Sequence, residues 1–218
     1  MRAAQRIPAL LAAAAVLLLV FFFLARLAGG GAPLAFDRDV LLMLRNSADA
    51  AAPVGPYWLR EFMGDVTALA GWPVLTLFTA LFTAFLAMRR HWRNASILLA
   101  AVIGQSVLVS QLKNLFERAR PDIVPHLAEA TSYSFPSGHS ASAVAVYLTL
   151  AAILSRETQR RREKTFIISA AVLLVVLVGF SRVYLGVHYP SDVLAGWSFG
   201  AAWASLVLLT AKFFDSKK

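Results

Sequence analysis

Three short groups of polar residues stand out in an otherwise apolar chain of 218 residues. They occupy residues 113–121, 136–139 and 181–192. Between them they contain fixed cations, a glycine-bearing turn, two histidines and a carboxylate. These are the groups that phosphoryl transfer through a phosphohistidine would need if no metal ion takes part.

The first group pairs Lys113 with Arg120, about two helical turns apart and nearly on one face. Pro121 disfavours helical geometry at Arg120, so we expect the helix to end there. Lysine supplies a point charge and arginine a planar fork for two phosphate oxygens. Taken alone, both are better explained as interfacial cations that reach into water, which is the role we predict for Arg118.

The second group is Pro136-Ser137-Gly138-His139. Pro136 suits the first position of a helix, so Ser137 and Gly138 are predicted to present free backbone N–H groups to an anion. Gly138 would also let a ligand approach the backbone closely. His139 follows on the first turn, although a histidine at the mouth of a membrane span can be merely interfacial.

The third group contains Ser181-Arg182, His188 and Asp192. Pro190 predicts the start of a helix, with Asp192 in its first turn, where the helix dipole favours an acid whatever its function. The carboxylate can also accept a hydrogen bond from one nitrogen of His188 and leave the other nitrogen free to attack. Arg182 would be a further phosphate ligand. An isolated His–Asp pair is a weak signal.

The elements that must position these residues are hydrophobic helices. The chain is 59% hydrophobic with a mean hydropathy of +0.65, which excludes an ordinary water-soluble domain. A helix needs ~20 apolar residues to cross ~30 Å of hydrocarbon. We therefore predict an all-α polytopic membrane protein, one domain over residues 1–218. Its six transmembrane helices are expected at about 7–27, 66–88, 94–116, 136–155, 165–186 and 190–211.

The first hydrophobic run also resembles a signal peptide, because Arg2 and Arg6 precede it. Its 19 residues exceed the usual ~7–15, and no clear cleavage site precedes the glycines at 29–31. We predict a retained first helix; cleavage would leave five spans in the same orientation.

Residues 28–65 are predicted to form a non-cytoplasmic segment at the membrane interface. Within it, Asp37 can cap a short helix on which Val40, Leu41 and Leu44 share one face. In the second span, Pro73 predicts either a kink or the true start of the helix.

Charge is distributed unevenly between the two sides of this topology. Thirteen of the 21 lysines and arginines, but only three of the 12 acids, fall at the two termini and in alternate loops. That side carries a net charge of +10 and the other side −1, which predicts that both termini are cytoplasmic. The asymmetry suits anionic lipid headgroups and argues against nucleic acid as a partner. The chain has no cysteine, which excludes disulfides and thiolate metal sites.

The same topology brings all three groups to one membrane face, opposite the basic loops. Lys113 lies at the outer end of the third span, and residues 136–139 begin the fourth. Arg182 ends the fifth span and Asp192 opens the sixth. Ionisable groups at membrane depth are costly unless they are paired or functional, so we predict one shared site.

Together the three groups resemble the signature of the type 2 phosphatidic acid phosphatase superfamily, and the six-span outline resembles its integral-membrane lipid phosphatases. The resemblance implies that His188 is the nucleophile, oriented by Asp192, and that His139 protonates the leaving oxygen. It also implies that five residues hold the nonbridging phosphate oxygens: Lys113, Arg120, Ser137, Gly138 and Arg182. No metal or other cofactor is expected, and one carboxylate among three cations is a poor Mg²⁺ site.

The resemblance and the membrane embedding imply a phosphatase acting on a lipid phosphate or diphosphate at the outer, periplasmic face of a bacterial inner membrane. Candidate substrates are undecaprenyl diphosphate, phosphatidate, phosphatidylglycerol phosphate and a lipid A phosphate. The motifs do not separate these candidates, because they are expected to contact the phosphate and not the tail. One alternative is a phosphotransferase, in which a second hydroxyl replaces water. Another is a transporter or flippase, which would need ionisable residues near mid-span.

Overall fold

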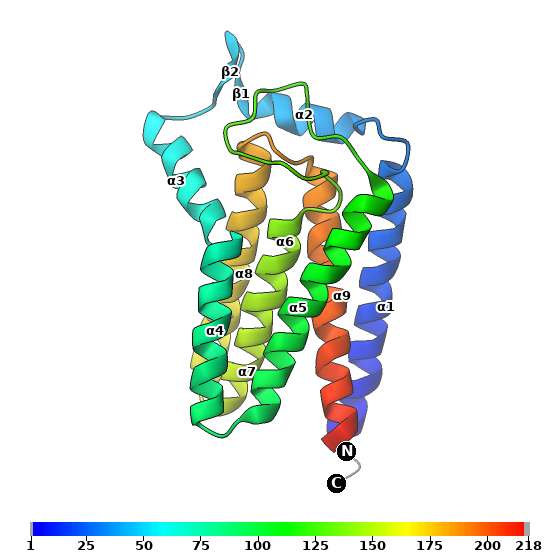
Figure 1. Cartoon of the computed structure of the whole chain (residues 1–218), viewed down its shortest axis with the longest axis vertical. Coiled ribbons are helices and arrows are strands. Elements are labelled where there is room, and N and C mark those ends of the chain that lie inside the picture. Colours follow the sequence, from blue (N-terminus) through cyan, green and yellow to red (C-terminus); the bar gives the residue numbers. More distant parts are fainter. Residues whose placement is uncertain (1, 216–218) are drawn as a thin grey trace.

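The computed structural model describes residues 2–215, which form a long bundle of helices (Figure 1). The helices are α1 Arg2–Ala28, α2 Ala35–Met43, α3 Tyr57–Ala68, α4 Trp72–Met88, α5 Trp92–Phe116, α6 Gly138–Ala143, α7 Thr149–Glu157, α8 Arg161–Tyr184 and α9 Pro190–Asp215. A π-helical turn, Val144–Leu148, joins α6 to α7. The described residues are therefore mainly helical, as predicted, with one short antiparallel hairpin of β1 Arg45–Asn46 and β2 Asp49–Pro53 and an irregular connection between α5 and α6.

Five helices in the described part of the chain are long and apolar enough to cross a membrane. They are Leu10–Ala28, Trp92–Phe116, Gly138–Glu157, Arg161–Tyr184 and Pro190–Ala211. A sixth span is obtained if α3 and α4, which meet at a bend of 45°, are counted together.

The predicted second span, residues 66–88, is divided between α3 and α4. Gly71 is the N-cap of α4 and Pro73 lies in its first turn, so Pro73 marks the true start of a helix. A proline tolerates this position because its missing N–H would have no partner in the first turn. Residues before this break belong to the separate helix α3, which leans away from the bundle (Figure 1).

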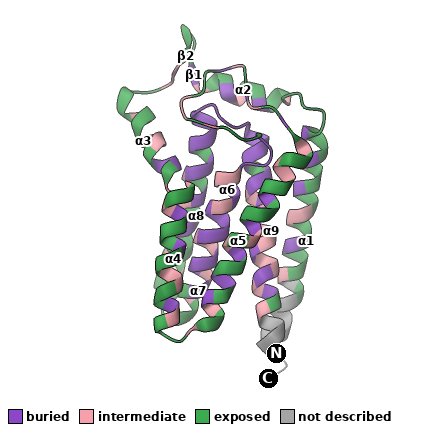
Figure 2. Ribbon diagram, in the orientation of Figure 1, coloured by how far each residue is buried: buried purple, intermediate pink, exposed green. Residues whose placement is uncertain are grey.

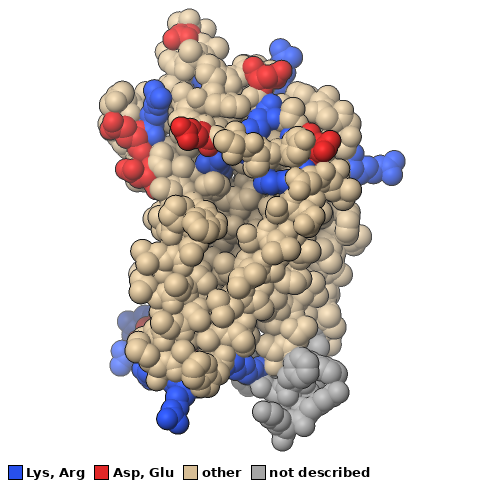
Figure 3. All heavy atoms as spheres, in the orientation of Figure 1, with Lys and Arg blue, Asp and Glu red and all other residues tan. Residues whose placement is uncertain are grey.

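The outer faces of the bundle are apolar. Leu19, Phe22 and Leu81 each expose 60% or more of their surface, and exposed residues follow the outer faces of α1, α4 and α5 (Figure 2). The face in Figure 3 has a broad band without charged side chains between two charged ends. Apolar patches of this extent are rare on soluble monomers, so the chain is an integral membrane protein.

The two ends of the bundle differ. Helix α1 begins and α9 ends at one end, where the α4–α5 and α7–α8 connections also lie (Figure 1). The opposite end carries α2, the hairpin and the long connection between α5 and α6. All three groups of polar residues lie at this second end.

Two glycines bring α9 against α6. A methyl group at Gly196 would lie 2.6 Å from the carbonyl oxygen of Ser137, and one at Gly200 would lie 2.8 Å from that of Ala141. The close approach allows the backbone N–H of Ser137 to donate to the carbonyl oxygen of Asp192 at 3.0 Å. Small residues in α9 therefore serve packing within the molecule and join the second polar group to the third.

Helix α2 lies across this end of the bundle. The predicted short helix forms, but it begins at Ala35 with Leu34 as its N-cap, so Asp37 lies in the first turn and its carboxylate accepts from the backbone N–H of Leu34 at 3.3 Å. Leu41 is fully buried against Val124, Tyr189 and their neighbours. Packing and a buried Asp37 attach this segment to the bundle.

Candidate active site

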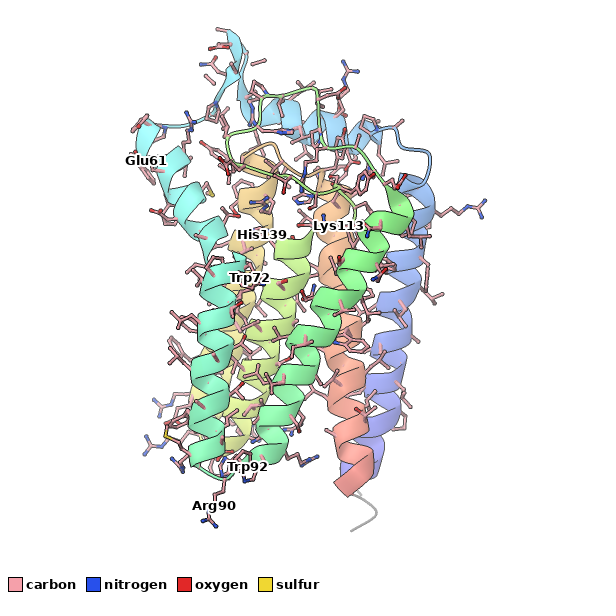
Figure 4. The ribbon with its side chains drawn as sticks, viewed as in Figure 1. Glu61, Trp72, Arg90, Trp92, Lys113 and His139 are labelled. Carbon is pink, nitrogen blue, oxygen red and sulfur yellow. The ribbon has the colours of Figure 1, made fainter. Side chains whose placement is uncertain are left out.

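A pocket of about 210 Å³ lies where the three polar groups meet. It is lined by six of the eight predicted site residues, Lys113, Arg120, Gly138, His139, Arg182 and His188, and by residues 129–132. Figure 4 shows Lys113 near the end of α5 and His139 at the start of α6, both at this end of the bundle. The remaining two, Ser137 and Asp192, are fully buried next to the pocket-lining residues.

Ser137 is the N-cap of α6, which begins at Gly138. Its Oγ accepts from the N–H of Ser140 at 3.4 Å and from the Oγ of Ser140 at 2.9 Å. The predicted free N–H of Ser137 is wrong, because it donates to Asp192. Pro136 precedes the cap and is not the first helical residue, so the helix starts two residues later than predicted. Gly138 does line the pocket, as predicted.

Lys113 and Arg182 approach the pocket from the ends of two helices. The Nζ of Lys113 donates to the carbonyl oxygen of Tyr133. The Nη1 of Arg182 donates to the Oγ1 of Thr67 in α3 at 2.9 Å, and Arg182 is only 3% exposed. The broken second span therefore holds one cation of the pocket in place.

Arg120 follows the end of α5 in the loop. Its Nε donates to the carbonyl of Ser132 at 2.7 Å, and its Nη1 donates to the carbonyl of Val187 at 2.6 Å. Nη1 also lies 3.3 Å from the Nε2 of His188. Burial lowers the pKa of Arg120 and Asp192 partly offsets the effect, but a guanidinium stays charged near neutral pH.

His188 lies between α8 and α9 and is 1% exposed. Its Nδ1 lies 3.4 Å from the Oδ2 of Asp192 and 3.4 Å from the Oγ of Ser134. A proton on Nδ1 would bond to these oxygens and leave the lone pair of Nε2 beside Arg120, at the pocket. Burial lowers the pKa of His188 well below its usual range, and the nearby cations, Arg182 first, lower it further. The neutral ring is the form that can attack phosphorus.

Asp192 is held by more partners than His188 alone. Its Oδ2 accepts from the Oγ of Ser134 and, at 2.9 Å, from the backbone N–H of Tyr189. Its Oδ1 accepts from the Nη1 of Arg118 at 2.6 Å. These bonds fix the carboxylate behind the imidazole.

The prediction that Arg118 is an interfacial cation in water is wrong. Arg118 is 1% exposed, bridges Asp192 to Asp37 (Nη2 to Oδ2, 3.0 Å) and lies 4.3 Å from the ring centre of Tyr189. The backbone explains the difference, because α5 ends at Phe116, the predicted end of the membrane span, and not at Arg120, where Pro121 predicted that the helix would end. Glu117 then adopts a left-handed conformation, with φ 45°, in which the chain leaves the helix.

Asp37 completes a closed network behind the pocket. Its carboxylate accepts from Arg118 and from both the N–H and the Oγ of Ser191, at 2.8 and 2.6 Å. We call Asp37, Arg118, Ser191 and Asp192 the buried network. The sequence signal for Arg118 was its place within the first polar group, two residues from Arg120; Asp37 was one acid in a short amphipathic helix. Ser134 and Thr67 gave no signal.

The pocket itself is positively charged. Three cations line it, and the carboxylate of Asp192, which is buried behind His188, already shares Arg118 with Asp37. Glu129 is an exposed residue at the pocket wall. The arrangement can therefore bind an anion with a neutral imidazole beside it.

Residues 94–215, more than half of the chain, match the family model of the PAP2 superfamily. The chain belongs to this superfamily. The superfamily is the one whose signature the three groups resemble, so that prediction is confirmed. The members to which the chain is similar are phosphatases, and the chain is a phosphatase.

Relatives share both sequence and fold. Phosphatidylglycerophosphatase B of Bacillus subtilis (strain 168) is 38% identical over 171 residues, which are 77% of this chain and 81% of that protein. A lipid A 1-phosphatase of Rhizobium etli is 35% identical over 130 residues, 56% of this chain and 51% of that protein. The crystal structure of a transmembrane PAP2-type phosphatidylglycerolphosphate phosphatase from Bacillus subtilis superposes with a TM-score of 0.77 at 32% identity, covering 94% of this chain and 96% of that one.

Proposed function

We propose that this phosphatase removes a phosphate from a membrane lipid phosphate or diphosphate, through a phosphohistidine on His188. The observation that carries the proposal is the junction of two cavities. An apolar groove of about 500 Å³ lies between α4 and α5 and has Gly138 and His139 in its wall. The same two residues line the cationic pocket. A phosphate in the pocket and an apolar tail in the groove would meet at His139.

The chemistry would take two steps. First, the lone pair of His188 Nε2 attacks phosphorus, the bond from phosphorus to the leaving oxygen breaks, and His139 gives that oxygen a proton. Then water attacks the phosphohistidine, His139 takes the proton from water, and inorganic phosphate leaves His188. The lipid product is an alcohol from a monoester or a monophosphate from a diphosphate.

The protein would stabilise the transferring group mainly by charge. Lys113, Arg120 and Arg182 converge on the pocket from three separate segments, and Gly138 allows the phosphate to approach the start of α6. Charge on the nonbridging oxygens is where most phosphoryl-transfer catalysis acts. In this structure Ser137 would act by capping α6, not by direct contact with phosphate.

We further propose that the reaction needs no metal ion, because cations of the chain occupy the places that metals take in two-metal sites. The test uses purified protein in detergent, phosphatidate, phosphatidylglycerol phosphate, undecaprenyl diphosphate and a lipid A phosphate as substrates, and excess EDTA. Inorganic phosphate should appear from at least one lipid without any added acceptor, and vanadate should inhibit. Activity lost in EDTA and restored by Mg²⁺ would contradict the metal-free mechanism, and phosphate release that needs an added alcohol would indicate a phosphotransferase.

The pocket is proposed to face the periplasm of an inner membrane. Support comes from the charge asymmetry, since the basic loops lie at the end of the bundle opposite the pocket. The chain has no cysteine, so single cysteines can be introduced as probes. In spheroplasts, a membrane-impermeant thiol reagent should label Ala50→Cys in the hairpin and not Gln159→Cys in the α7–α8 connection. The reverse pattern would contradict the orientation.

A further inference from the structure

The groove between α4 and α5 is not uniformly apolar. Five of its lining residues carry hydroxyl or amide groups: Thr76, Thr79, Gln105, Ser106 and Ser142. These five residues come from α4, α5 and α6 and line one cavity, which extends deeper into the bundle than the phosphate pocket. A hydrocarbon tail would need none of them.

Two of these polar groups have no hydrogen-bond partner within the described chain. The amide oxygen of Gln105 accepts from the Oγ of Ser142 at 3.1 Å, but its Nε2 is buried and unpaired. The Oγ1 of Thr79, across the groove in α4, is likewise buried and unpaired. Gln105 and Thr79 expose only 1% and 6% of their surface. Buried donors without partners are unfavourable, so each calls for an explanation.

The position of these donors fits a particular part of a lipid. Ser142, which holds Gln105, lies one helical turn beyond His139 in α6, roughly 5 Å along the axis. We propose that His139 protonates the lipid oxygen attached to phosphorus. In a phosphorylated diacylglycerol, an ester carbonyl follows that oxygen within a few atoms, and it is purely an acceptor. In a polyprenyl monophosphate the same distance is filled by hydrocarbon. In a polyprenyl diphosphate it is filled by the second phosphate, and the groove lining contains no lysine or arginine for that charged group.

We infer that Gln105 and Thr79 form a subsite for an ester carbonyl of a phosphorylated diacylglycerol lipid. The inference rests on the proposed function, since it requires the tail to occupy the groove. An ester carbonyl would accept from the amide of Gln105 or the hydroxyl of Thr79 and remove an unpaired donor in the complex. A polyprenyl tail would leave both donors without partners.

The test compares two substrates that differ only at the carbonyl. One is a diacylglycerol phosphate, and the other is its dialkyl ether analogue of equal chain length, with each ester carbonyl replaced by methylene. We expect wild-type kcat/KM to be roughly tenfold higher for the ester. Gln105→Met should lower kcat/KM for the ester about tenfold and for the ether at most about twofold. Thr79→Val should act in the same direction with a smaller effect.

Thr83 supplies a matched control. It lies one turn from Thr79 in α4, and its Oγ1 is also buried and unpaired, but it does not line the groove. Thr83→Val should therefore leave the ester-to-ether ratio at the wild-type value. If Gln105 had a purely structural role, Gln105→Met would lower kcat/KM for both substrates equally, and the ester-to-ether ratio of kcat/KM would not change.

The possible outcomes separate this inference from the proposed function. Phosphate release from both substrates with equal kcat/KM in wild type overturns the carbonyl subsite and leaves lipid phosphatase activity standing. The carbonyl subsite is likewise overturned if Gln105→Met lowers kcat/KM for the ester and the ether equally. If Gln105→Met does not fold, the wild-type ratio and Thr79→Val still decide. No phosphate from any lipid overturns the proposed function and the subsite together.

Discussion

Arg118 and Arg120 are separated by a single residue, yet Arg118 belongs to the buried network and Arg120 to the wall of the pocket. Arg118 is enclosed in the buried network, where two carboxylates balance its charge. Arg120 lies on the pocket wall, where its side chain donates to backbone carbonyls and pairs with no carboxylate among the described residues. A cation such as Arg118, whose charge is balanced by carboxylates of the protein, fixes the positions of the side chains around it. One that the protein leaves unbalanced is available to a ligand's charge.

The largest effect is expected at the proposed nucleophile, His188. His188→Ala should abolish lipid phosphatase activity, because no other imidazole nitrogen faces the pocket with a carboxylate behind it in the described structure. The measurement is phosphate release from protein whose folding is checked by thermal unfolding. His91→Ala, at the other end of the bundle, is the matched control and should keep wild-type activity. More than a few per cent of wild-type activity in a folded His188→Ala protein would refute the phosphohistidine.

The next largest effect links the two regions through Asp192. Asp192→Asn keeps the shape of the side chain but removes the charge that orients His188 and pairs with Arg118. We expect kcat to fall by ~10³–10⁴-fold while remaining above the His188→Ala background, as for other nucleophile–base pairs. Single-turnover kinetics with radiolabelled lipid would measure it. A loss of less than tenfold would mean that Asp192 does not orient the nucleophile.

The difference between the two arginines can be tested by replacing each one and measuring both activity and stability. Arg120→Gln should lower kcat/KM by ~10²-fold with little change in thermal unfolding, because it removes charge from the pocket wall. Arg118→Met leaves Asp37 and Asp192 buried without their shared cation, which typically costs ~3–5 kcal/mol of stability. Its unfolding temperature in detergent should fall sharply. Equal losses of stability in the two variants would show that the two regions do not differ as described.

A smaller effect is expected on pH dependence. Burial and nearby cations lower the pKa of His188, so protonation of the nucleophile should reduce kcat/KM only well below pH ~6.5, the ordinary histidine value. Arg120→Gln removes one of these cations and should move the acid limb to higher pH. Substrate ionisation is common to both proteins, so the difference between their profiles isolates the enzyme. An acid limb that stays in place or moves to lower pH would contradict this electrostatic account.

The sequence predicted the residues of the pocket better than those of the buried network behind it. Lys113, His139 and Arg182 could be found because their types and spacing are unusual at membrane depth, and because the order of apolar runs placed them at one end. Asp37 and Arg118 meet across 81 positions, and no local pattern encodes such a pairing. The end of α5 at Phe116 is accompanied by the left-handed conformation of Glu117, which the Arg120-Pro121 pair did not reveal.

Other differences have similarly local causes. Pro73 allowed two outcomes for the second span, and packing of α3 against α8 accompanies the one observed. The hairpin at residues 45–53 contains no β-branched residue and gave no strand signal. Gln105 and Thr79 are uncharged polar residues within long apolar runs, and their shared cavity became visible only when α4 and α5 were placed side by side.

The reach of Asp37 into the buried network bears on how far the enzyme can be reduced in size. The stretch that matches the PAP2 superfamily, residues 94–215, holds every residue of the three polar groups. A fragment cut to that stretch would nevertheless lose Asp37, one of the two carboxylates beside Arg118, and Thr67, the threonine beside Arg182. It would also lose the α1 phenylalanine, Phe21, whose ring stacks on Phe135 ahead of the second group. Carrying the signature is therefore not the same as being a minimal catalytic module. Transplanting or trimming this phosphatase would require keeping residues before position 94, which contain none of the three polar groups.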